Sequence, residues 1–240
     1  MSITVAKSAG FCFGVNRAIN IVNSLLDKNV KVSTLGPIIH NMEVVNELES
    51  RGCKAVDNID EVEKDATLVI RSHGVPKYVI DKLDENGVKY EDATCPFVKK
   101  IHNIVANPDN KDGIVLIAGN SVHPEVEGII GHCSTECHTF KNSEEIDEIY
   151  NIVLNKNNKQ VFVVAQTTFD TKEWKKCVKK IKKLCTNAKI FDTICYATRK
   201  RQTEAADIAA KVDVMVVVGD RKSANTQHLA EICRQNCSRV

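Results

Sequence analysis

Two hydrophobic patterns alternate along this chain: short continuous apolar runs, and longer runs in which apolar residues recur at helical spacing. The continuous runs predict buried β-strands, and they read VKVSTL, ATLVI, DGIVLIA, KQVFVVA and DVMVVV. A loop and a helix-like run follow each of them, in the order MEVVNELESRG, KYVIDKLDENG, EVEGIIG, TKEWKKCVKKIKKL and TQHLAEIC. Because strands without polar alternation are covered on both faces, this order predicts an α/β fold with parallel sheets.

The N-terminus and the composition narrow the class of protein. The run MSITVAKSAG predicts a first strand and not a signal peptide, because it lacks a charged and then apolar order. No run approaches the ~18 apolar residues of a membrane span. A net charge of +2 requires neither a nucleic-acid nor a membrane partner, and 43% hydrophobic residues are ordinary for a globular protein. We therefore expect a cytoplasmic protein that binds neither.

Three of the ten cysteines share one local setting. A strand-like run ends at Cys12, at Cys95 and at Cys195, and a helix-like run with Arg or Lys follows each one. Without an export signal, thiol or metal chemistry explains these cysteines better than a disulfide framework. Three thiolates around one centre form an incomplete shell for a cubane iron–sulfur cluster, which usually takes four. Three buried cysteines acting as small core residues are the alternative.

The same junctions divide the chain into three units. Residues 1–95 and 96–194 each have the length of a small α/β lobe. Residues 195–240 hold only a helix, a strand over 213–218 and a second helix, so the third lobe is expected to be incomplete. Packing of the lobes around a pseudo-threefold axis would bring the three cysteines to one point.

Polar residues gather where the predicted strands run into helices. Among them are His40, Asn41, Ser72, His73, His123, Glu125, Gln166, Thr167, Thr168, Ser223 and Asn225. Ligands of open α/β sheets bind beyond the carboxyl ends of the strands, where helix N-termini favour anions. These donors suit a diphosphate, and no Walker or dinucleotide fingerprint indicates a nucleotide. Taken singly, each residue is equally explained by helix capping or by a turn.

Eight motifs occur in an order that resembles one enzyme family. They read GFCFGVNRAI, LGPIIHN, RSHGVP, DATCPFVKKIH, GNSVHPEVEG, QTT, ICYATRKRQ and VGDRKSAN, and they span Gly10 to about Ala230. The series is similar to that of the LytB family of 4-hydroxy-3-methylbut-2-enyl diphosphate reductases, which catalyse the last step of the methylerythritol phosphate route to isoprenoids. The resemblance implies an oxidoreductase with three α/β lobes around a central [4Fe–4S] cluster. Its reaction would convert (E)-4-hydroxy-3-methylbut-2-enyl diphosphate to isopentenyl diphosphate and dimethylallyl diphosphate.

The resemblance also implies roles for individual residues, carried over by position. The cluster ligands would be Cys12, Cys95 and Cys195. The diphosphate pocket would contain His40, His73, His123, Ser223 and Asn225. Glu125 would supply protons to the departing hydroxyl, with His123 next in line, and Thr167 would help to position that end of the substrate. A separate ferredoxin or flavodoxin would deliver electrons, because the chain has no flavin or nicotinamide fingerprint.

Departures from the family leave two alternative functions open. The family chain continues past Val240 and commonly has a serine where Ala224 stands, so we expect a truncated third lobe and little activity from this chain alone. One alternative is another three-cysteine iron–sulfur enzyme acting on a small anion, although it would want arginines in loops that offer histidine, serine, threonine and asparagine. The second alternative is an inactive homologue with a structural metal role. The run HCSTECH, residues 132–138, resembles a zinc pair. Four cysteines read as packing residues: Cys53, Cys177, Cys185 and Cys233.

Overall fold

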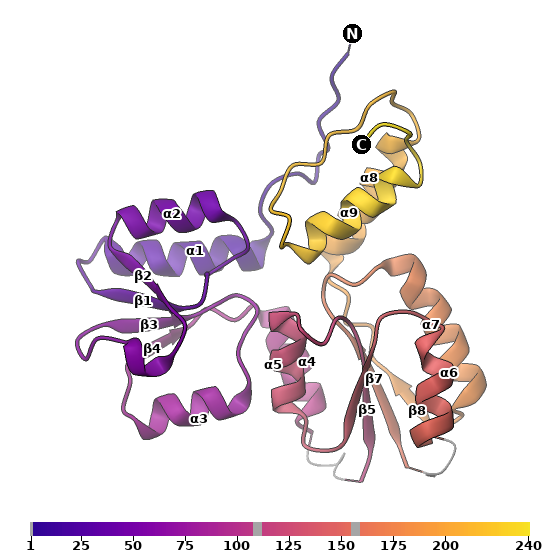
Figure 1. The fold of residues 1–240 in the computed structure, drawn as a ribbon, viewed down its shortest axis with the longest axis horizontal. Helices are drawn as coiled ribbons and strands as arrows, with labels where there is room; N and C mark the ends of the chain where they lie inside the picture. The colour runs from indigo at the N-terminus through magenta and orange to yellow at the C-terminus, as the bar shows by residue number, and fades with distance from the viewer. Residues whose placement is uncertain (1, 108–111, 155–158) are drawn as a thin grey trace. The chain divides into compact units, whose positions relative to one another are not determined.

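The structure is a computed structural model that describes residues 2–107, 112–154 and 159–240 (Figure 1). It contains two compact units. Unit A consists of Phe11–Asn107 and Val122–Ser134, and unit B consists of Met1–Gly10, Pro108–Ser121 and Thr135–Val240. The predicted lobe boundaries at residues 95 and 195 stay a prediction.

Unit A is built on a four-stranded parallel sheet with the order β2-β1-β3-β4. Its elements are α1 (Phe13–Leu26), β1 (Val32–Leu35), α2 (Met42–Ser50), β2 (Cys53–Val56), the 3-10 helix η1 (Ile59–Glu61), β3 (Thr67–Ile70), α3 (Lys77–Glu85), β4 (Tyr90–Asp92), α4 (Pro96–Val105) and α5 (Pro124–His132). Helices α1 and α2 lie on one face of this sheet and α3 on the other (Figure 1). The central strand serves both layers, because Val69 packs with the first pair whereas Leu68 and Ile70 pack with α3.

Unit B repeats the plan with the strand order β6-β5-β7-β8, again all parallel. Its elements are β5 (Ile114–Ala118), β6 (Cys137–Phe140), α6 (Glu145–Ile149), the π-helical turn η3 (Tyr150–Leu154), β7 (Val161–Ala165), α7 (Thr171–Leu184), β8 (Ala188–Ile190), α8 (Tyr196–Ala209) and α9 (Ala224–Arg234). The two sheets confirm the predicted α/β fold. Across the described ranges, no helix is both long enough and apolar enough to cross a membrane.

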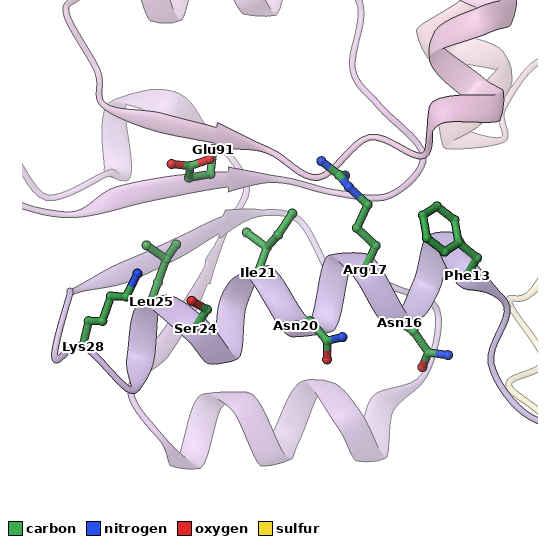
Figure 2. A pocket seen from close by; sticks show the side chains of 9 residues that line it. All are labelled: Phe13, Asn16, Arg17, Asn20, Ile21, Ser24, Leu25, Lys28 and Glu91. Atoms are coloured by element: carbon green, nitrogen blue, oxygen red, sulfur yellow. The ribbon is translucent and has the colours of Figure 1, made fainter.

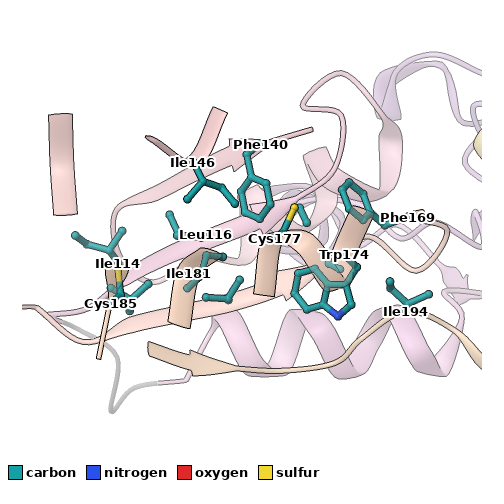
Figure 3. Close-up of a cluster of buried hydrophobic side chains, with 14 residues drawn as sticks. Ile114, Leu116, Phe140, Ile146, Phe169, Trp174, Cys177, Ile181, Cys185 and Ile194 are labelled. Atoms are coloured by element: carbon teal, nitrogen blue, oxygen red, sulfur yellow. The ribbon is translucent and has the colours of Figure 1, made fainter. Parts of the chain in front are cut away.

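The core of unit B explains why its strands are continuously apolar. Strands β5 and β7 are buried along their whole length. One face of the sheet packs against the apolar stripe of α7, formed by Trp174, Cys177 and Ile181 (Figure 3). Asp170 begins that helix by accepting a hydrogen bond from the Glu173 N–H at 2.6 Å. Each fully buried large aliphatic side chain contributes about 1.5–3 kcal/mol through removal of apolar surface from water.

The two strands predicted outside these sheets do not form. Residues 2–6 and 213–218 have no regular secondary structure, and neither segment belongs to a sheet within the described part of the chain. In the second segment Met215 and Val217 pack partly against α8 and α9, whereas Val216 is 76% exposed. The predictions were wrong because an extended run becomes a strand only where another strand satisfies its backbone groups. The third lobe is therefore incomplete, with two helices and no described sheet.

Candidate functional site

Each of the three predicted cluster cysteines is the N-cap residue of a helix. Cys12 precedes α1, Cys95 precedes α4 and Cys195 precedes α8, and all three thiols are partly exposed. The strand–cysteine–helix setting is confirmed for Cys95 after β4 and for Cys195 after β8. At such positions the helix N-terminus favours an anionic ligand such as a thiolate.

Within unit A, the start of α1 lies against Cys95. The Cys95 N–H donates to the Ser72 carbonyl at 3.0 Å, which ties the cysteine to the loop after β3. Gly14, in the first turn of α1, has its backbone so close that a Cβ there would lie 2.6 Å from the Cys95 Sγ. The chain therefore brings the helix end that carries Cys12 against the thiol of Cys95.

Arg17 of α1 fixes the same junction from the other side. Its guanidinium donates to the carbonyls of Asp92 at 3.2 Å and Thr94 at 3.3 Å. Burial alone would raise the pKa of Asp92, but hydrogen bonds from Lys99 and Thr94 hold that pKa below its ordinary value. Arg17 also lines an open groove of about 510 Å³ along α1, which contains none of the predicted site residues (Figure 2).

In unit B, Cys195 is held by the equivalent loop. Its N–H donates to the carbonyl of Thr167 at 3.0 Å, and the Thr167 side chain is buried. Ser223 begins α9 and accepts a hydrogen bond from the Thr226 N–H at 3.4 Å, with half-buried Asn225 in the first turn. The His228 Nδ1 lies 2.7 Å from the Thr168 carbonyl, so α9 is tied to the loop that positions Cys195.

The three predicted histidines meet in unit A. The ring centroids of His40 and His73 are 4.8 Å apart, those of His73 and His123 are 5.5 Å apart, and those of His40 and His123 are 6.0 Å apart. One ligand atom from each ring lies within 4.8 Å of the others, so the cluster could hold a metal ion or several oxygens of an anion. The Ser72 N–H donates to the Ile38 carbonyl at 3.4 Å and joins the loops that carry His40 and His73.

Burial and one hydrogen bond determine where protons lie in this cluster. The Nδ1 of His123 accepts a hydrogen bond from the Glu125 N–H at 3.1 Å, which leaves its Nε2 to carry the proton of the neutral ring and act as a donor. Burial first, and then the neighbouring His40, His123 and Arg71, lower the pKa of His73 well below its ordinary value. A neutral imidazole has one N–H that can donate to a phosphate oxygen and one lone pair that can bind a metal ion, so the cluster suits either ligand.

Glu125 is the buried carboxyl of this region. It stands in the first turn of α5, after His123 and Pro124, and only 2% of its surface is exposed. Burial of this depth is unusual for a glutamate whose only role is to favour a helix N-terminus, since that role needs no burial.

Two further histidines of unit A connect helices α4 and α5. His102 of α4 stacks on His132 of α5 with ring centroids 4.0 Å apart. Gly74, next to His73, leaves room for this ring, because a Cβ there would lie 2.7 Å from the His102 Cε1. Burial, followed by the effect of His132, lowers the pKa of His102 to about 3, so this ring is neutral at neutral pH.

The other cysteines differ from the three at helix starts. Burial is the main cause that raises the pKa of Cys53 to about 11 and that of Cys177 to about 12, as expected of the packing role predicted for them. Cys133 ends α5 in unit A and Cys137 begins β6 in unit B. Among the described residues the one group of three possible metal ligands is the histidine cluster, so the run HCSTECH forms no such group there.

The structure adds three residues to the predicted set. Arg17 anchors the strand end before Cys95, His228 anchors α9, and Arg71 lies beside His73. Each stands inside a motif already quoted or within one helical turn of it. Arg71 also corrects the expectation that these loops offer no arginine. The predicted residues fall into two groups: unit A holds Cys12, His40, His73, Cys95, His123 and Glu125, and unit B holds Thr167, Cys195, Ser223 and Asn225.

Repeated parallel sheets with histidines and cysteines at helix starts define an α/β protein suited to an anionic ligand. The model of the LytB protein family matches residues 3–240, and the chain belongs to that family. It is 43% identical over 98% of its length to the 4-hydroxy-3-methylbut-2-enyl diphosphate reductase of Alkaliphilus oremlandii, of which it covers 82%. The reductase of Clostridioides difficile is 39% identical over 97% of this chain and 82% of its own length.

Solved structures agree with the sequence relatives. The E-1-hydroxy-2-methyl-but-2-enyl-4-diphosphate reductase from Plasmodium falciparum matches with a TM-score of 0.87 and 30% identity, over 96% of this chain and 73% of that one. A structure of (E)-4-hydroxy-3-methyl-but-2-enyl diphosphate reductase, described as the terminal enzyme of the non-mevalonate pathway, matches with a TM-score of 0.73 and 36% identity. That match covers 98% of this chain and 84% of the other.

Proposed function

We propose that this chain is a reductase that converts (E)-4-hydroxy-3-methylbut-2-enyl diphosphate to isopentenyl diphosphate and dimethylallyl diphosphate, the last step of the methylerythritol phosphate pathway. Membership of the LytB family supports the reaction. The observation that carries it in this chain is the cluster of His40, His73 and His123, with buried Glu125 two residues after His123 at the start of the same helix. The two features offer anion donors and a proton donor in one unit.

The diphosphate is held by neutral donors. Imidazole N–H groups of His40, His73 and His123 hydrogen-bond its oxygens, and Ser223 and Asn225 at the start of α9 add a hydroxyl and an amide. These contacts lie away from the carbon that reacts. Their binding energy therefore serves to position the hydroxyl-bearing end of the substrate.

The chain's cysteines fit a [4Fe–4S] cluster. Cys12, Cys95 and Cys195 are partly exposed thiols at helix N-termini, and the start of α1 is packed against Cys95. We assign these three as its ligands, in contrast to the buried thiol of Cys177. When bound, such a cluster supplies electrons one at a time and an iron without a cysteine ligand.

Protons come from the polypeptide. The reaction consumes two electrons and two protons and releases the substrate hydroxyl as water. The Glu125 carboxyl gives one proton to the leaving hydroxyl oxygen, which departs as water, and the second proton goes to the carbon that receives the electron pair. His123, whose backbone and ring cap the same helix, is the next candidate for the proton donor. The Thr167 hydroxyl, on a buried side chain of unit B, helps to position the substrate hydroxyl.

The electron donor is a separate protein. We assign a ferredoxin or flavodoxin to this role, because no flavin or nicotinamide fingerprint occurs in the sequence. A cytoplasmic location likewise stays a prediction.

Turnover by the purified chain tests the proposal. Under anaerobic conditions, with reduced methyl viologen as electron source, the chain should oxidise the dye only when the hydroxymethylbutenyl diphosphate is present, at the low rate expected of an incomplete third lobe. Both five-carbon diphosphates should accumulate, as detected by mass spectrometry. Dye oxidation without either product would contradict the proposed reaction.

A further inference from the structure

Arg71 is a half-buried cation that has no ion-pair partner among the described residues. It directly follows β3, two residues before His73, and its side chain is half-buried. Its Nε atom is buried with no hydrogen-bond partner, and it forms no ion pair within the part of the chain that the structure describes. Two other arginines do form ion pairs there, Arg51 with Asp27 and Arg199 with Asp192.

The backbone is shaped to accept this guanidinium. Gly36, at the end of β1, has a φ of +67°, and a Cβ at that position would lie 3.2 Å from an Arg71 terminal nitrogen. The Gly74 N–H donates to the Arg71 carbonyl at 3.0 Å, so Arg71 and His73 belong to one tight turn. A side chain at position 36 would press on the Arg71 guanidinium, and the left-handed φ would strain the backbone of any residue that replaces Gly36.

The charge of Arg71 acts on the histidine cluster. It is one of the causes that lower the pKa of His73, which places the guanidinium within electrostatic reach of that ring. Burial lowers the pKa of Arg71 itself, and the opposing effect comes from Glu127, an exposed residue of α5. A single exposed carboxylate is a weak partner for a buried cation, because water screens its charge.

We propose that Arg71 is a further anion-binding residue of this chain, which adds a permanent positive charge to the cluster of His40, His73 and His123 and pairs with the diphosphate of the substrate. This deepens the proposed function and rests on it. The reason is charge balance: burying a cation is unfavourable unless an anion accompanies it, and a diphosphate arriving at neutral imidazoles brings that anion. A guanidinium offers planar paired donors that match phosphate oxygens.

Binding of inorganic pyrophosphate to the full chain tests the assignment by titration calorimetry. Replacing the guanidinium by an amide in Arg71→Gln should weaken binding about ten- to a hundredfold, because a charge-assisted contact is lost. Arg71→Lys should recover part of the affinity, since it keeps the charge and loses the fork. Arg51→Gln is the matched control: it removes one arginine charge from the same unit at a surface ion pair and should change affinity less than twofold.

The melting temperature of the ligand-free protein distinguishes an anion-binding role of Arg71 from a structural one, because loss of a structural residue would lower it. Removing a half-buried cation that has no ion-pair partner should leave the melting temperature of Arg71→Gln equal to or above that of the wild type. The dependence of pyrophosphate affinity on potassium chloride should also become shallower. A lower melting temperature together with unchanged pyrophosphate affinity would make Arg71 a structural residue and overturn the assignment.

A third variant separates this inference from the function beneath it. His73→Asn should weaken pyrophosphate binding if the histidine cluster is the anion site. If His73→Asn fails to bind while Arg71→Gln binds like the wild type, the inference about Arg71 is wrong and the proposed function stands. If the wild-type chain does not bind pyrophosphate at all, the anion site and the role of Arg71 are both wrong.

Discussion

The strand–cysteine–helix segments at Cys95 and Cys195 have the same local structure, although they belong to different units of the molecule. An aspartate stands three residues before each cysteine, and a basic residue stands four residues after it. The two form an ion pair in both places, Asp92 with Lys99 and Asp192 with Arg199. Each cysteine N–H donates at 3.0 Å to a carbonyl in the loop after the central strand. The repeated scaffold therefore fixes where the thiol stands.

The loops that hold the two cysteines differ in chemistry. After β3 the sequence is Arg71-Ser72-His73, and after β7 at the same offsets it is Gln166-Thr167-Thr168. The buried polar residue seven positions after each cysteine also differs. In α4 it is His102, which lies against Gly74, and in α8 it is Gln202, which forms hydrogen bonds with the backbone of Phe169 and Thr171. Unit A thus offers cationic and imidazole donors for an anion, and unit B offers uncharged hydroxyls and amides.

Because Cys95 and Cys195 have the same local structure, both should be required for the cluster and for turnover. Cys95→Ser and Cys195→Ser should each abolish turnover and most visible cluster absorbance, because a hydroxyl is a poor ligand for iron. Cys177→Ser in the core of α7 should keep the absorbance, although it should lower stability. Absorbance spectra and methyl viologen turnover of the three purified variants measure this. Loss of the cluster in Cys177→Ser with retention in Cys95→Ser would break the comparison.

The chemical difference between the units predicts the next largest effect. Glu125→Gln keeps shape and hydrogen bonding but cannot release a proton, so kcat should fall about 10²- to 10⁴-fold with little change in substrate binding. Glu43→Gln is the control, because Glu43 is an exposed first-turn glutamate of α2 in the same unit. Steady-state kinetics decide between the roles. Equal, small effects of the two substitutions would mean that Glu125 serves only the helix N-terminus.

Gly14→Ala probes the contact between α1 and Cys95. The new methyl group would meet the Cys95 Sγ at 2.6 Å, so iron content per chain should fall severalfold. Alanine favours a helix over glycine by roughly 0.5–1 kcal/mol, so the fold itself should not suffer. Iron analysis and thermal melting separate the two effects, with Asn20→Ala on the exposed face of α1 as the control. Unchanged iron content would show that the start of α1 can move away from the thiol.

The smallest expected effect is on stability in acid, and it arises because His102 of unit A stands at the position that Gln202 occupies in unit B. Unfolded, His102 takes up a proton below about pH 6.5, whereas folded it stays neutral down to a pKa of about 3. The free energy of unfolding is therefore unaffected above that range and should fall by about 2 kcal/mol on going to pH 5. His102→Gln, which copies the residue of unit B, should remove this loss in urea unfolding at pH 7.5 and 5.0. An equal loss in both proteins would assign the acid sensitivity to other groups.

Periodicity and position predicted the regular parts of the molecule well. The runs from ATLVI to KQVFVVA became the central strands, because each is buried between two layers and needs no polar alternation. The predicted cysteines stand at helix starts, and His40 and His73 meet because β1 and β3 end at the same edge of one sheet. His123 joins them from the start of α5, which follows a strand of the other sheet.

The errors share a physical cause, which is that pairing is not a local property. DVMVVV has a strand sequence, yet the Met215 N–H donates to the Arg239 carbonyl at 2.8 Å in a turn of chain outside any sheet. Arg71 was missed for a related reason. An arginine after a strand is ordinary in sequence, and only the structure shows that its Nε is buried without a partner.

Metal and sulfide analysis of the anaerobically purified wild-type chain tests the central claim most directly. The account predicts about four irons and about four acid-labile sulfides per chain, as a [4Fe–4S] cluster requires. Both should be lost when Cys12, Cys95 and Cys195 are replaced together by serine. About one zinc per chain without sulfide, or iron that survives the triple replacement, would contradict the assignment of these three helix-start cysteines as cluster ligands.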